Sequence, residues 1–387
     1  MMPIYLDYNA TTPTDPRVVE AMIPFMTTQY GNPANTLHSY GWAAETAVNK
    51  ATDQVCHLLN CRKNEITWNS GATEGNNTVF WGLYFQYQKQ NPGQPIHYIT
   101  TAIEHASVAN TLKKMKEFFP SFDYSIVPVD NQGFVQISEI EKCVRPETKL
   151  LSVMWVNNEI GTIQDIHRLS HWAQAKNIYF HSDATQAAGK IRIDVSQYPL
   201  HFLTVSSHKM YGPKGVGFLY IRSQNPHVEI ESFVSGGSHQ SGRRAGTLNV
   251  PAIVGAGLAC ELAHQEFESE NQRNQKLQRM VYDQLKSEFP QLKLNGPSID
   301  SGQRSPINLS LTFTGYTIDL YLSRLGKLAF SQGSACRSGQ TTVSPVLSAI
   351  GLNYEQASQT VRLSLGKYTT ENDILDAVRI FKNAFTT

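Results

Sequence analysis

The stretch FLTVSSHKMYGPKGVGFLYI (residues 202–221) places two apolar runs on either side of a polar turn. The runs, 202–205 and 216–221, are rich in β-branched and aromatic residues, a composition typical of buried strands. A lysine, Lys209, follows the first run almost at once. Because a charged ammonium is hard to keep solvated next to buried strands, the position of this lysine needs an explanation.

Further apolar runs precede this stretch and alternate with segments of helical spacing. They are Glu65–Trp68, His97–Thr101, Tyr124–Val127, Leu150–Val156 and Ile178–His181. Short strands that alternate with helices predict an α/β fold. We therefore expect a mostly parallel sheet flanked by helices on both faces.

The pattern changes after Pro251. A long helical stretch, 261–286, leads into a separate region, and Thr370 and Asp373 form a capping box for its last helix. We expect a large α/β domain and a smaller α+β domain. The predicted boundaries are 15–260 for the large domain, and 1–14 with 261–387 for the small one.

The composition argues against several classes of protein. Among 387 residues, 41% are hydrophobic and 17% charged, and a net charge of +1 creates no field that attracts nucleic acid or an anionic membrane. The apolar run 250–260 is too short to span a bilayer, and the N-terminus lacks the pattern of a signal peptide. We expect a soluble cytoplasmic protein. Five cysteines without a CxxC pair predict neither a disulfide framework nor a metal site.

Polar residues directly follow several predicted strands. These groups are Ser70–Thr73, Glu104 with His105, Asn157–Glu159, Asp183 with Gln186, and Ser206 with His208 and Lys209. In open α/β sheets the carboxyl ends of the strands form the ligand crevice. We therefore expect these side chains to converge on one site.

Three of these features also have plain structural explanations. The turn 70–73 suits a phosphate through free N–H groups and the helix dipole, or is an ordinary capped turn. Asp183 holds a cationic group, or it caps a helix or pairs with Lys190. Lys209 supplies an amine with a pKa lowered by burial, or its charged end reaches solvent. Together with His105, these groups match the needs of pyridoxal phosphate.

Ten motifs occur in an order that resembles the NifS/IscS-type cysteine desulfurases, of the class V aminotransferase-like, fold-type I superfamily. The motifs are YLDYNATTP, GNPANTLHSYG, SGATEGNN, EHASV, VNNEIG, HSDATQAAGK, SSHKMYGPKGVG, GGSHQSGRRAGTLN, GSAC and VRLSLG. The resemblance covers nearly the whole chain. It implies pyridoxal phosphate as cofactor and conversion of L-cysteine to L-alanine. Gly75 stands where this family usually has serine.

The resemblance also implies a role for each site residue. Lys209 would bind the cofactor aldehyde and move the Cα proton, His105 would stack on the ring and assist protonation, and Asp183 would hold the ring nitrogen. Further implied cofactor ligands are Gln186 and Asn157 near the ring, and Ala72, Thr73, Ser206, His208 and, from the second subunit of a homodimer, Thr247 at the phosphate. Asn157 and Arg362 would grip the substrate carboxylate.

Cys336 lies in SQGSACRSGQTTVSP (residues 331–345), which is rich in small and polar residues. We expect a mobile loop with an accessible thiol, whereas Cys56, Cys143 and Cys260 fit buried small hydrophobes. Within the resemblance, the Cys336 thiolate would take the substrate sulfur as a persulfide and deliver it to an acceptor protein, such as an iron–sulfur scaffold.

Some other functions are compatible with parts of this sequence but less so than cysteine desulfuration. A kynureninase or an aminotransferase has no use for Cys336. A non-catalytic sulfur or iron–sulfur scaffold has no use for Lys209, Asp183, His105 and Arg362. A selenocysteine lyase stays open, because its substrate differs from cysteine by one atom.

Overall fold

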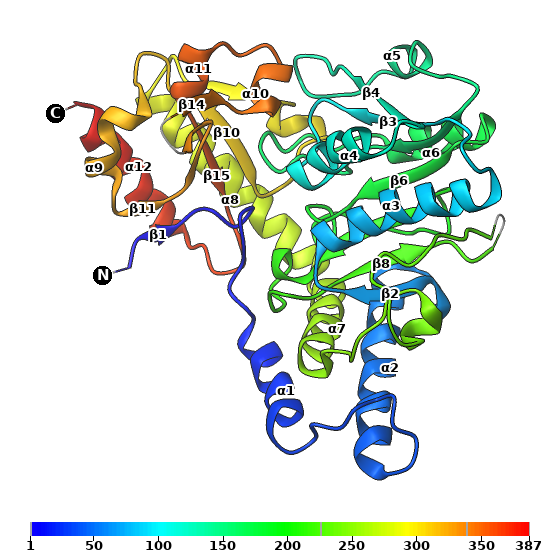
Figure 1. Ribbon diagram of the computed structural model, residues 1–387. Helices are drawn as coiled ribbons and strands as arrows, with labels where there is room; N and C mark the ends of the chain where they lie inside the picture. The colour runs from blue at the N-terminus through cyan, green and yellow to red at the C-terminus, as the bar shows by residue number, and fades with distance from the viewer. Residues whose placement is uncertain (1, 225–226, 338–339, 387) are drawn as a thin grey trace.

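The structure, a computed structural model, describes residues 2–224, 227–337 and 340–386, with backbone only for 334–337 and 340–342. Its largest element is a seven-stranded sheet in the order β2-β8-β7-β6-β5-β3-β4. The strands are β2 (Ile66–Asn69), β3 (Ile96–Thr101), β4 (Phe122–Val127), β5 (Thr148–Ser152), β6 (Tyr179–Asp183), β7 (Phe202–Ser206) and β8 (Gly217–Ile221). Neighbouring strands are parallel, except that β8 runs antiparallel to both β7 and β2. The predicted mostly parallel sheet is confirmed (Figure 1).

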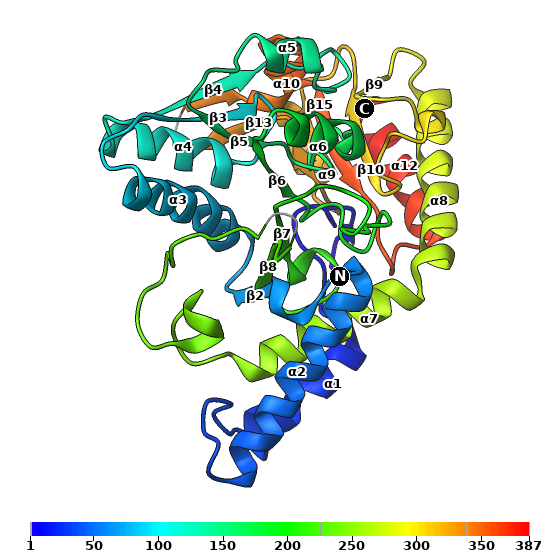
Figure 2. The same ribbon diagram turned by 90° about the vertical axis from the view of Figure 1, so that its right-hand side faces the viewer.

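Both faces of this sheet are buried. Successive strand residues point to opposite faces, so Tyr98 and Phe202 pack in one core cluster and Ile99 and Leu203 in another. The first cluster lies under α3 (Ala72–Gln90) and α4 (Ala106–Phe118); the second lies under α2 (Ser39–Leu59), α6 (Ile166–Ala175) and α7 (Val250–Gln265). Figure 2 shows these two helical layers, which confirm the expected covering of both faces.

A second, antiparallel sheet forms in the C-terminal part of the chain, in the order β12-β15-β10-β9. Its strands are β9 (Lys293–Asn295), β10 (Asn308–Thr312), β12 (Ser331–Gln332) and β15 (Thr360–Ser364). The helices α8 (Phe267–Glu288) and α12 (Glu371–Thr386) pack beside it. This sheet and its helices match the expectation of a smaller α+β unit.

Two predicted helical features can be compared directly. The capping box of α12 is confirmed, since Thr370 N donates to Asp373 Oδ2 at 2.8 Å and Asp373 N donates to Thr370 Oγ1 at 3.1 Å. The long helix expected over 261–286 is instead two helices, α7 and α8, which meet at Glu266. No glycine or proline lies at this junction, so the sequence pattern does not reveal the break.

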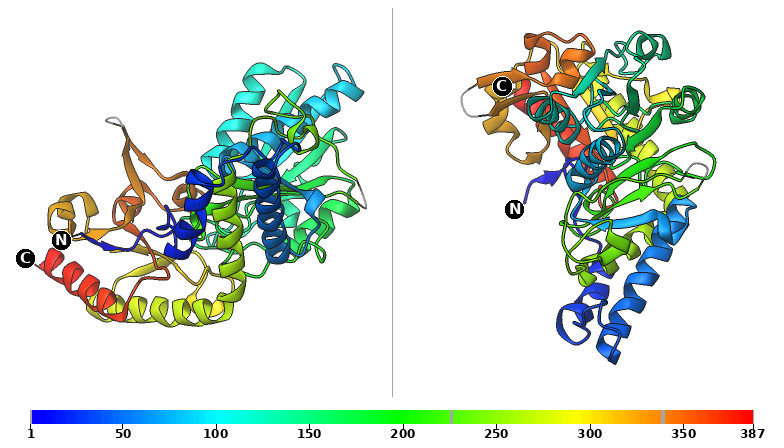
Figure 3. Two further views of the ribbon diagram at one scale, coloured as in Figure 1. Left: turned by 90° about the horizontal axis from the view of Figure 1, so that it is seen from below. Right: turned by 45° about the vertical axis from the view of Figure 1, so that its right-hand side comes forward.

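The N-terminus belongs structurally with the C-terminal region. Strand β1 (Ile4–Tyr5) pairs in parallel with β11 (Leu328–Ala329), and both chain ends lie on the side of the molecule formed by the C-terminal region (Figure 3). The chain then runs toward the large sheet, where Thr12 N donates to His208 O at 3.0 Å. Residues 7–12 thus bridge the two sheets before α1 (Pro16–Thr27). The exact domain boundaries stay a prediction.

The segment that carries Cys336 was expected to be a mobile loop with an accessible thiol, and both properties stay predictions. Its backbone forms a hairpin of β13 (Ser334–Arg337) and β14 (Gln340–Val343), with Cys336 opposite Thr341. The run from Thr341 to Val343 is β-branched, which favours extended backbone. The Cys336 thiol itself lies outside the described side chains.

The remaining elements are short. They include α5 (Ile137–Glu141), α9 (Leu322–Leu325), α10 (Pro345–Ala349), α11 (Tyr354–Ser358) and the 3₁₀ turn η2 (Ser207–Lys209). Within the part of the chain that is described, no helix has the length and apolar character needed to cross a membrane.

Candidate active site

The loops that follow the parallel strands open on a cavity of about 680 Å³. The N-terminal segment and β15 complete its wall. Nine of the predicted site residues line it: Ala72, Thr73, His105, Asp183, Gln186, Ser206, His208, Lys209 and Arg362. The predicted convergence of the strand-end groups is therefore what the fold produces.

One end of the cavity suits a phosphate. Gly71 precedes the first turn of α3 with φ 138°, a conformation that favours glycine, and a Cβ there would lie 3.3 Å from Ser206 Oγ. The first N–H groups of α3 have no partner within the helix and carry its positive dipole end. Burial and the nearby Lys209 lower the pKa of His208 to about 4, so its ring is neutral near pH 7. Backbone and neutral side-chain donors thus meet at this end.

The glycine at position 75 has a packing reason. A Cβ at Gly75 would lie 2.7 Å from Thr204 Cγ2 and 3.1 Å from Asn69 Nδ2. Helix α3 therefore lies too close to β7 for the family's usual serine unless Thr204 moves. Gly75 does not line the cavity, so this departure from the family pattern concerns the packing of helix against strand.

Asp183 ends β6 as a buried carboxylate with a 5% exposed side chain. Its Oδ2 accepts a hydrogen bond from Asn76 Nδ2 at 2.8 Å, and its Oδ1 accepts one from Thr185 N at 3.0 Å. The alternative ion pair with Lys190 is not formed, because Lys190 Nζ donates to Gln186 Oε1 at 2.8 Å. Asp183 faces the cavity with oxygen lone pairs to spare, which suits a protonated ring nitrogen.

Lys209 follows β7 in η2 and points into the same cavity. Its Nζ donates to Asn9 O and to Ala10 O, both at 2.6 Å. Burial, together with the positive charge of Arg362, lowers the pKa of Lys209 to about 8. A sizeable fraction of neutral amine near physiological pH is what attack on a carbonyl requires, which answers why a lysine stands there.

His105 is the N-cap of α4 and lines the cavity. Its Nδ1 accepts a hydrogen bond from Ser107 N at 3.1 Å. An accepting Nδ1 cannot carry a proton, so the neutral ring holds its hydrogen on Nε2. The ring is thus fixed in orientation and in tautomer at the cavity wall.

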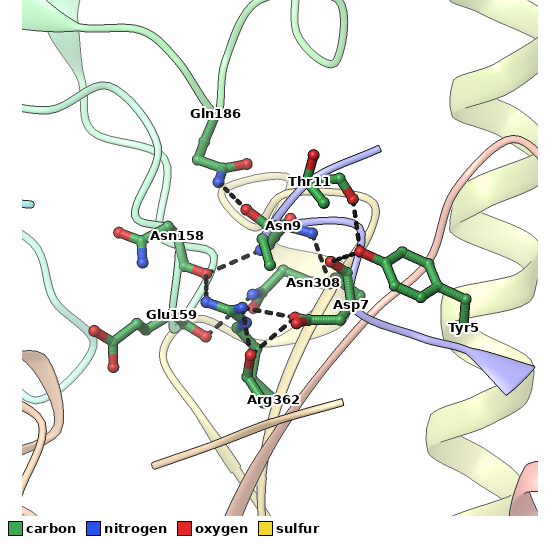
Figure 4. A network of polar contacts seen from close by, with 12 residues as sticks. Tyr5, Asp7, Asn9, Thr11, Asn158, Glu159, Gln186, Asn308 and Arg362 are labelled. Atoms are coloured by element: carbon green, nitrogen blue, oxygen red, sulfur yellow. Dashed lines mark hydrogen bonds and ion pairs between the residues drawn. The ribbon is translucent and has the colours of Figure 1, made fainter. Parts of the chain in front are cut away.

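Arg362, on β15, is held by a network that Figure 4 shows. Its Nη2 donates to Asp7 Oδ1 and to Ser331 Oγ, both at 2.7 Å, and its Nη1 donates to Asn158 O at 3.2 Å. Its Nε is buried and has no hydrogen-bond partner within the described residues. The guanidinium is therefore anchored on one edge and keeps donors for an anionic ligand.

The N-terminal residues that complete this site could not be predicted from the sequence. Asn9 Nδ2 donates to Asn158 O at 3.0 Å, and Asn9 O accepts from Gln186 Nε2 at 2.8 Å (Figure 4). Together with Asp7, Asn9 ties the N-terminal segment to both sheets. The motif YLDYNATTP was noted, but only the folded chain reveals that it crosses the cavity.

Two of the other predicted residues lie outside the cavity lining. Asn157 is fully buried outside the lining: its Oδ1 accepts from Glu159 N at 2.8 Å and from Ile160 N at 2.9 Å, and its Nδ2 donates to Ile103 O at 3.0 Å. Its amide thus braces the loop, while the adjacent Asn158 faces the cavity. Thr247 is exposed and does not line the cavity within one chain. The thiol of Cys336 lies outside what the structure describes, so the roles of these three residues stay predictions.

A second acid, Glu104, is buried behind His105. Its Oε1 accepts from Thr101 Oγ1 and from Met154 N, both at 2.8 Å, and its Oε2 has no partner in the described chain. Burial raises the pKa of Glu104 to about 8. The carboxyl of Glu104 is therefore largely protonated near neutral pH.

Exchanging Glu104 for glutamine is expected to change how stability depends on pH. The folded pKa lies above the unfolded value, so the wild type loses free energy of unfolding as pH rises from about 5 to about 8. The amide of E104Q cannot ionise, so the free energy of unfolding of this variant should rise relative to that of the wild type across this window, by an amount on the order of 1–4 kcal/mol. Urea unfolding at both pH values, with the exposed Glu45→Gln as control, measures this. A stability difference independent of pH would contradict it.

Comparison with known proteins places the chain in a family. The aminotransferase class-V family matches residues 4–376, so the chain belongs to that family. It is similar to the cysteine desulfurase IscS of Vibrio cholerae, with 40% identity over 385 residues, 99% of this chain and 93% of the relative. Among solved structures it is similar to a NifS-like protein (TM-score 0.89, 32% identity, 99% of each chain). It is also similar to SspA in complex with cysteine (TM-score 0.80, 31% identity, 95% of this chain and 99% of that one).

These likenesses confirm the resemblance inferred from the motifs. They support a cysteine desulfurase that depends on pyridoxal phosphate, over the weighed alternatives. The groups that line the cavity fit that cofactor: donors that suit a phosphate lie at one end, Asp183 offers a carboxylate for the ring nitrogen, and Lys209 offers an amine for the aldehyde. Thr185 Oγ1, which is buried in the wall without a described partner, is a further donor for a bound group.

Proposed function

We propose that this protein converts L-cysteine to L-alanine and takes the sulfur onto Cys336 as a persulfide, for transfer to an acceptor protein. One observation carries the proposal most strongly. Lys209, Asp183 and Arg362 line a single cavity: the amine and the carboxylate come from the ends of two parallel strands, and the guanidinium comes from the middle of β15. These are the groups that amino-acid chemistry on pyridoxal phosphate requires.

The residues of the chain divide the work. Bound pyridoxal phosphate supplies an electron sink that makes the Cα–H bond of an amino acid acidic. Asp183 keeps the ring nitrogen protonated, which sustains that sink, and His105 holds the plane of the ring. Lys209 removes and returns the proton at Cα, since its lowered pKa suits proton transfer near neutral pH.

The sulfur step balances without an added oxidant. The Cys336 thiolate forms an S–S bond to the substrate sulfur, the substrate S–Cβ bond breaks, and Cβ takes a proton. Alanine leaves and the sulfur stays as a persulfide. The hairpin that bears Cys336 is tied to the site at its base, where Ser344 Oγ donates to Glu159 Oε2 at 2.5 Å. This contact supports a thiol that works close to the cavity.

The reaction itself tests the proposal. With L-cysteine and a thiol reductant, the purified holoenzyme should release alanine and sulfide in equal amounts. Comparing alanine release from L-cysteine and from L-selenocysteine separates the desulfurase from a selenocysteine lyase. Alanine from selenocysteine alone, or pyruvate in place of alanine, would overturn the assignment.

Lysine in place of Arg362 is expected to raise KM for cysteine about 10- to 100-fold with a smaller effect on kcat. An ammonium cannot give the two parallel hydrogen bonds of a guanidinium to a carboxylate. Steady-state kinetics measure the split between KM and kcat. Arg379→Lys, on the exposed side of α12, is the control. An unchanged KM in R362K would remove Arg362 from the carboxylate site.

We also propose that the protein works as a homodimer. The arm formed by α1 and α2 exposes Val19, Ile23, Met26, Tyr30, Leu37, Tyr40 and Trp42, with Leu37 at 87% exposure. So many large apolar side chains on one arm favour burial against a second copy. Thr247 is free to reach a partner's phosphate site. Sedimentation velocity of the holoenzyme tests the pairing, and a stable monomer would exclude it.

An iron–sulfur scaffold as acceptor and a cytoplasmic location are proposals that rest on the resemblance. Incubation of the sulfur-loaded enzyme with a candidate scaffold protein would test the first, by transfer of labelled sulfur. Cell fractionation would test the second.

A further inference from the structure

Asn76, on α3, lies between the two residues proposed to act on the cofactor ring. It is fully buried, and its Nδ2 donates to Asp183 Oδ2 at 2.8 Å and to Ser107 Oγ at 2.9 Å. Both amide hydrogens are thus used. The opposite orientation of the amide would set its oxygen against the Asp183 carboxylate, so the polarity of the contact is determined.

The hydroxyl of Ser107 connects Asn76 to His105 by hydrogen bonds. Because Ser107 Oγ accepts from Asn76, its own hydrogen is free to point to His105 Nδ1, 2.9 Å away. Ser107 N donates to the same nitrogen at 3.1 Å. Two donors aimed at Nδ1 leave the ring proton on Nε2, the nitrogen on the far side of the ring from Ser107.

The polarity of each contact is therefore set. Asn76 donates in two directions, to the Asp183 carboxylate and to Ser107 Oγ, and Ser107 Oγ donates onward to His105 Nδ1. Asp183 ends β6 and His105 caps α4, and Asn76 connects the two through these hydrogen bonds. Donation to the carboxylate favours its ionised form.

We propose that Asn76 is a positioning residue that holds the Asp183 carboxylate and, by orienting the Ser107 hydroxyl, directs a second hydrogen bond to His105 Nδ1. This inference rests on the proposed function, since it concerns how two residues are prepared for the cofactor. The backbone N–H groups of Thr185 and Ser107 also donate to Asp183 and to His105, but the amide of Asn76 is the group that connects the two ends of the relay.

Two variants cut the relay at different points. Asn76→Asp keeps the shape but replaces the donor with a second carboxylate beside Asp183. Ser107→Ala leaves the contact to Asp183 and removes the hydroxyl that faces His105. Asn110→Asp, on the exposed side of α4, makes the same charge change away from the site and is the matched control.

Two measurements on the holoenzyme report the two ends. Ring ¹⁵N shifts of histidine-labelled protein, assigned through His105→Gln, report the tautomer of His105. The pH midpoint of the absorption band of the bound cofactor reports the state of the carboxylate. The other titratable groups facing Asp183 are Glu104, His181 and Lys209, and all three variants retain them.

The wild type and Asn110→Asp should show an unprotonated Nδ1. Asn76→Asp should shift the cofactor midpoint by about one pH unit or more, and it should move the Nδ1 resonance of His105, because the new carboxylate takes the hydrogen of the Ser107 hydroxyl. Ser107→Ala should keep the midpoint and an unprotonated Nδ1, since the backbone N–H still donates, but should move the Nδ1 resonance because one of its two hydrogen bonds is lost. A protonated Nδ1 in the wild type, or a Ser107→Ala spectrum equal to the wild type, overturns the inference, even if Asn76→Asp does not fold. Failure of the wild type to turn over cysteine would instead refute the proposed function. The tautomer of His105 could still be measured in that case.

Discussion

Alanine in place of Lys209 should leave a folded protein that turns over cysteine at least about 10³-fold more slowly. The variant loses two hydrogen bonds to Asn9 O and Ala10 O, but it also removes a buried positive charge, so its stability should change little. It loses both the covalent attachment of the cofactor and the base that handles the Cα proton. Two functions on one amine explain why the expected effect is so large.

Borohydride reduction followed by peptide mapping measures the attachment. In the wild type the cofactor should be fixed to the peptide that contains Lys209, and in K209A it should wash away after denaturation. Lys176→Ala, at an exposed position, should behave as the wild type. Attachment to a different lysine would contradict the account.

Alanine in place of Cys336 should reduce sulfide release at least about 10²-fold and leave cysteine binding intact. Lys209, Asp183 and Arg362 do not depend on the thiol, so the spectral change on adding cysteine should persist. In C336A the transfer of sulfur from the substrate lacks its nucleophile. The variant should therefore accumulate bound substrate rather than product.

Cys143→Ala is the matched control, because Cys143 is partly exposed but lies beside the core of the large sheet. Cys336→Ser separates loss of nucleophilicity from loss of shape. Sulfide release by C336A at the wild-type rate would show that another group accepts the sulfur.

The strands of the large sheet could be predicted because their apolar runs are bounded by polar strand ends. The run at Phe202–Val205, for example, is β7 within one residue. The same boundaries predicted Asp183, Lys209 and His105, since Asp183 ends a strand and the other two lie in the turns that follow one. A local sequence pattern is therefore enough to predict functional residues that lie at the end of a strand.

Residues that act through contacts between distant segments could not be predicted in this way. Asp7 meets Arg362 only because β1 joins the second region, and Asn76 looks like any polar residue of an amphipathic helix. The sequence likewise does not reveal that the buried amide of Asn157 braces its own loop, and its role at the substrate stays a prediction. Such assignments depend on side-chain direction, which sequence spacing does not determine.

Mass spectrometry of the holoenzyme after treatment with L-cysteine and removal of reductant tests the central claim most directly. The account predicts one added sulfur atom on the tryptic peptide of residues 328–337, which contains Cys336, and no added sulfur on the peptides of the other cysteines. The added sulfur should disappear with a thiol reductant and should never form in K209A. Alanine release with that peptide unmodified, or with the sulfur on another cysteine, would contradict the account.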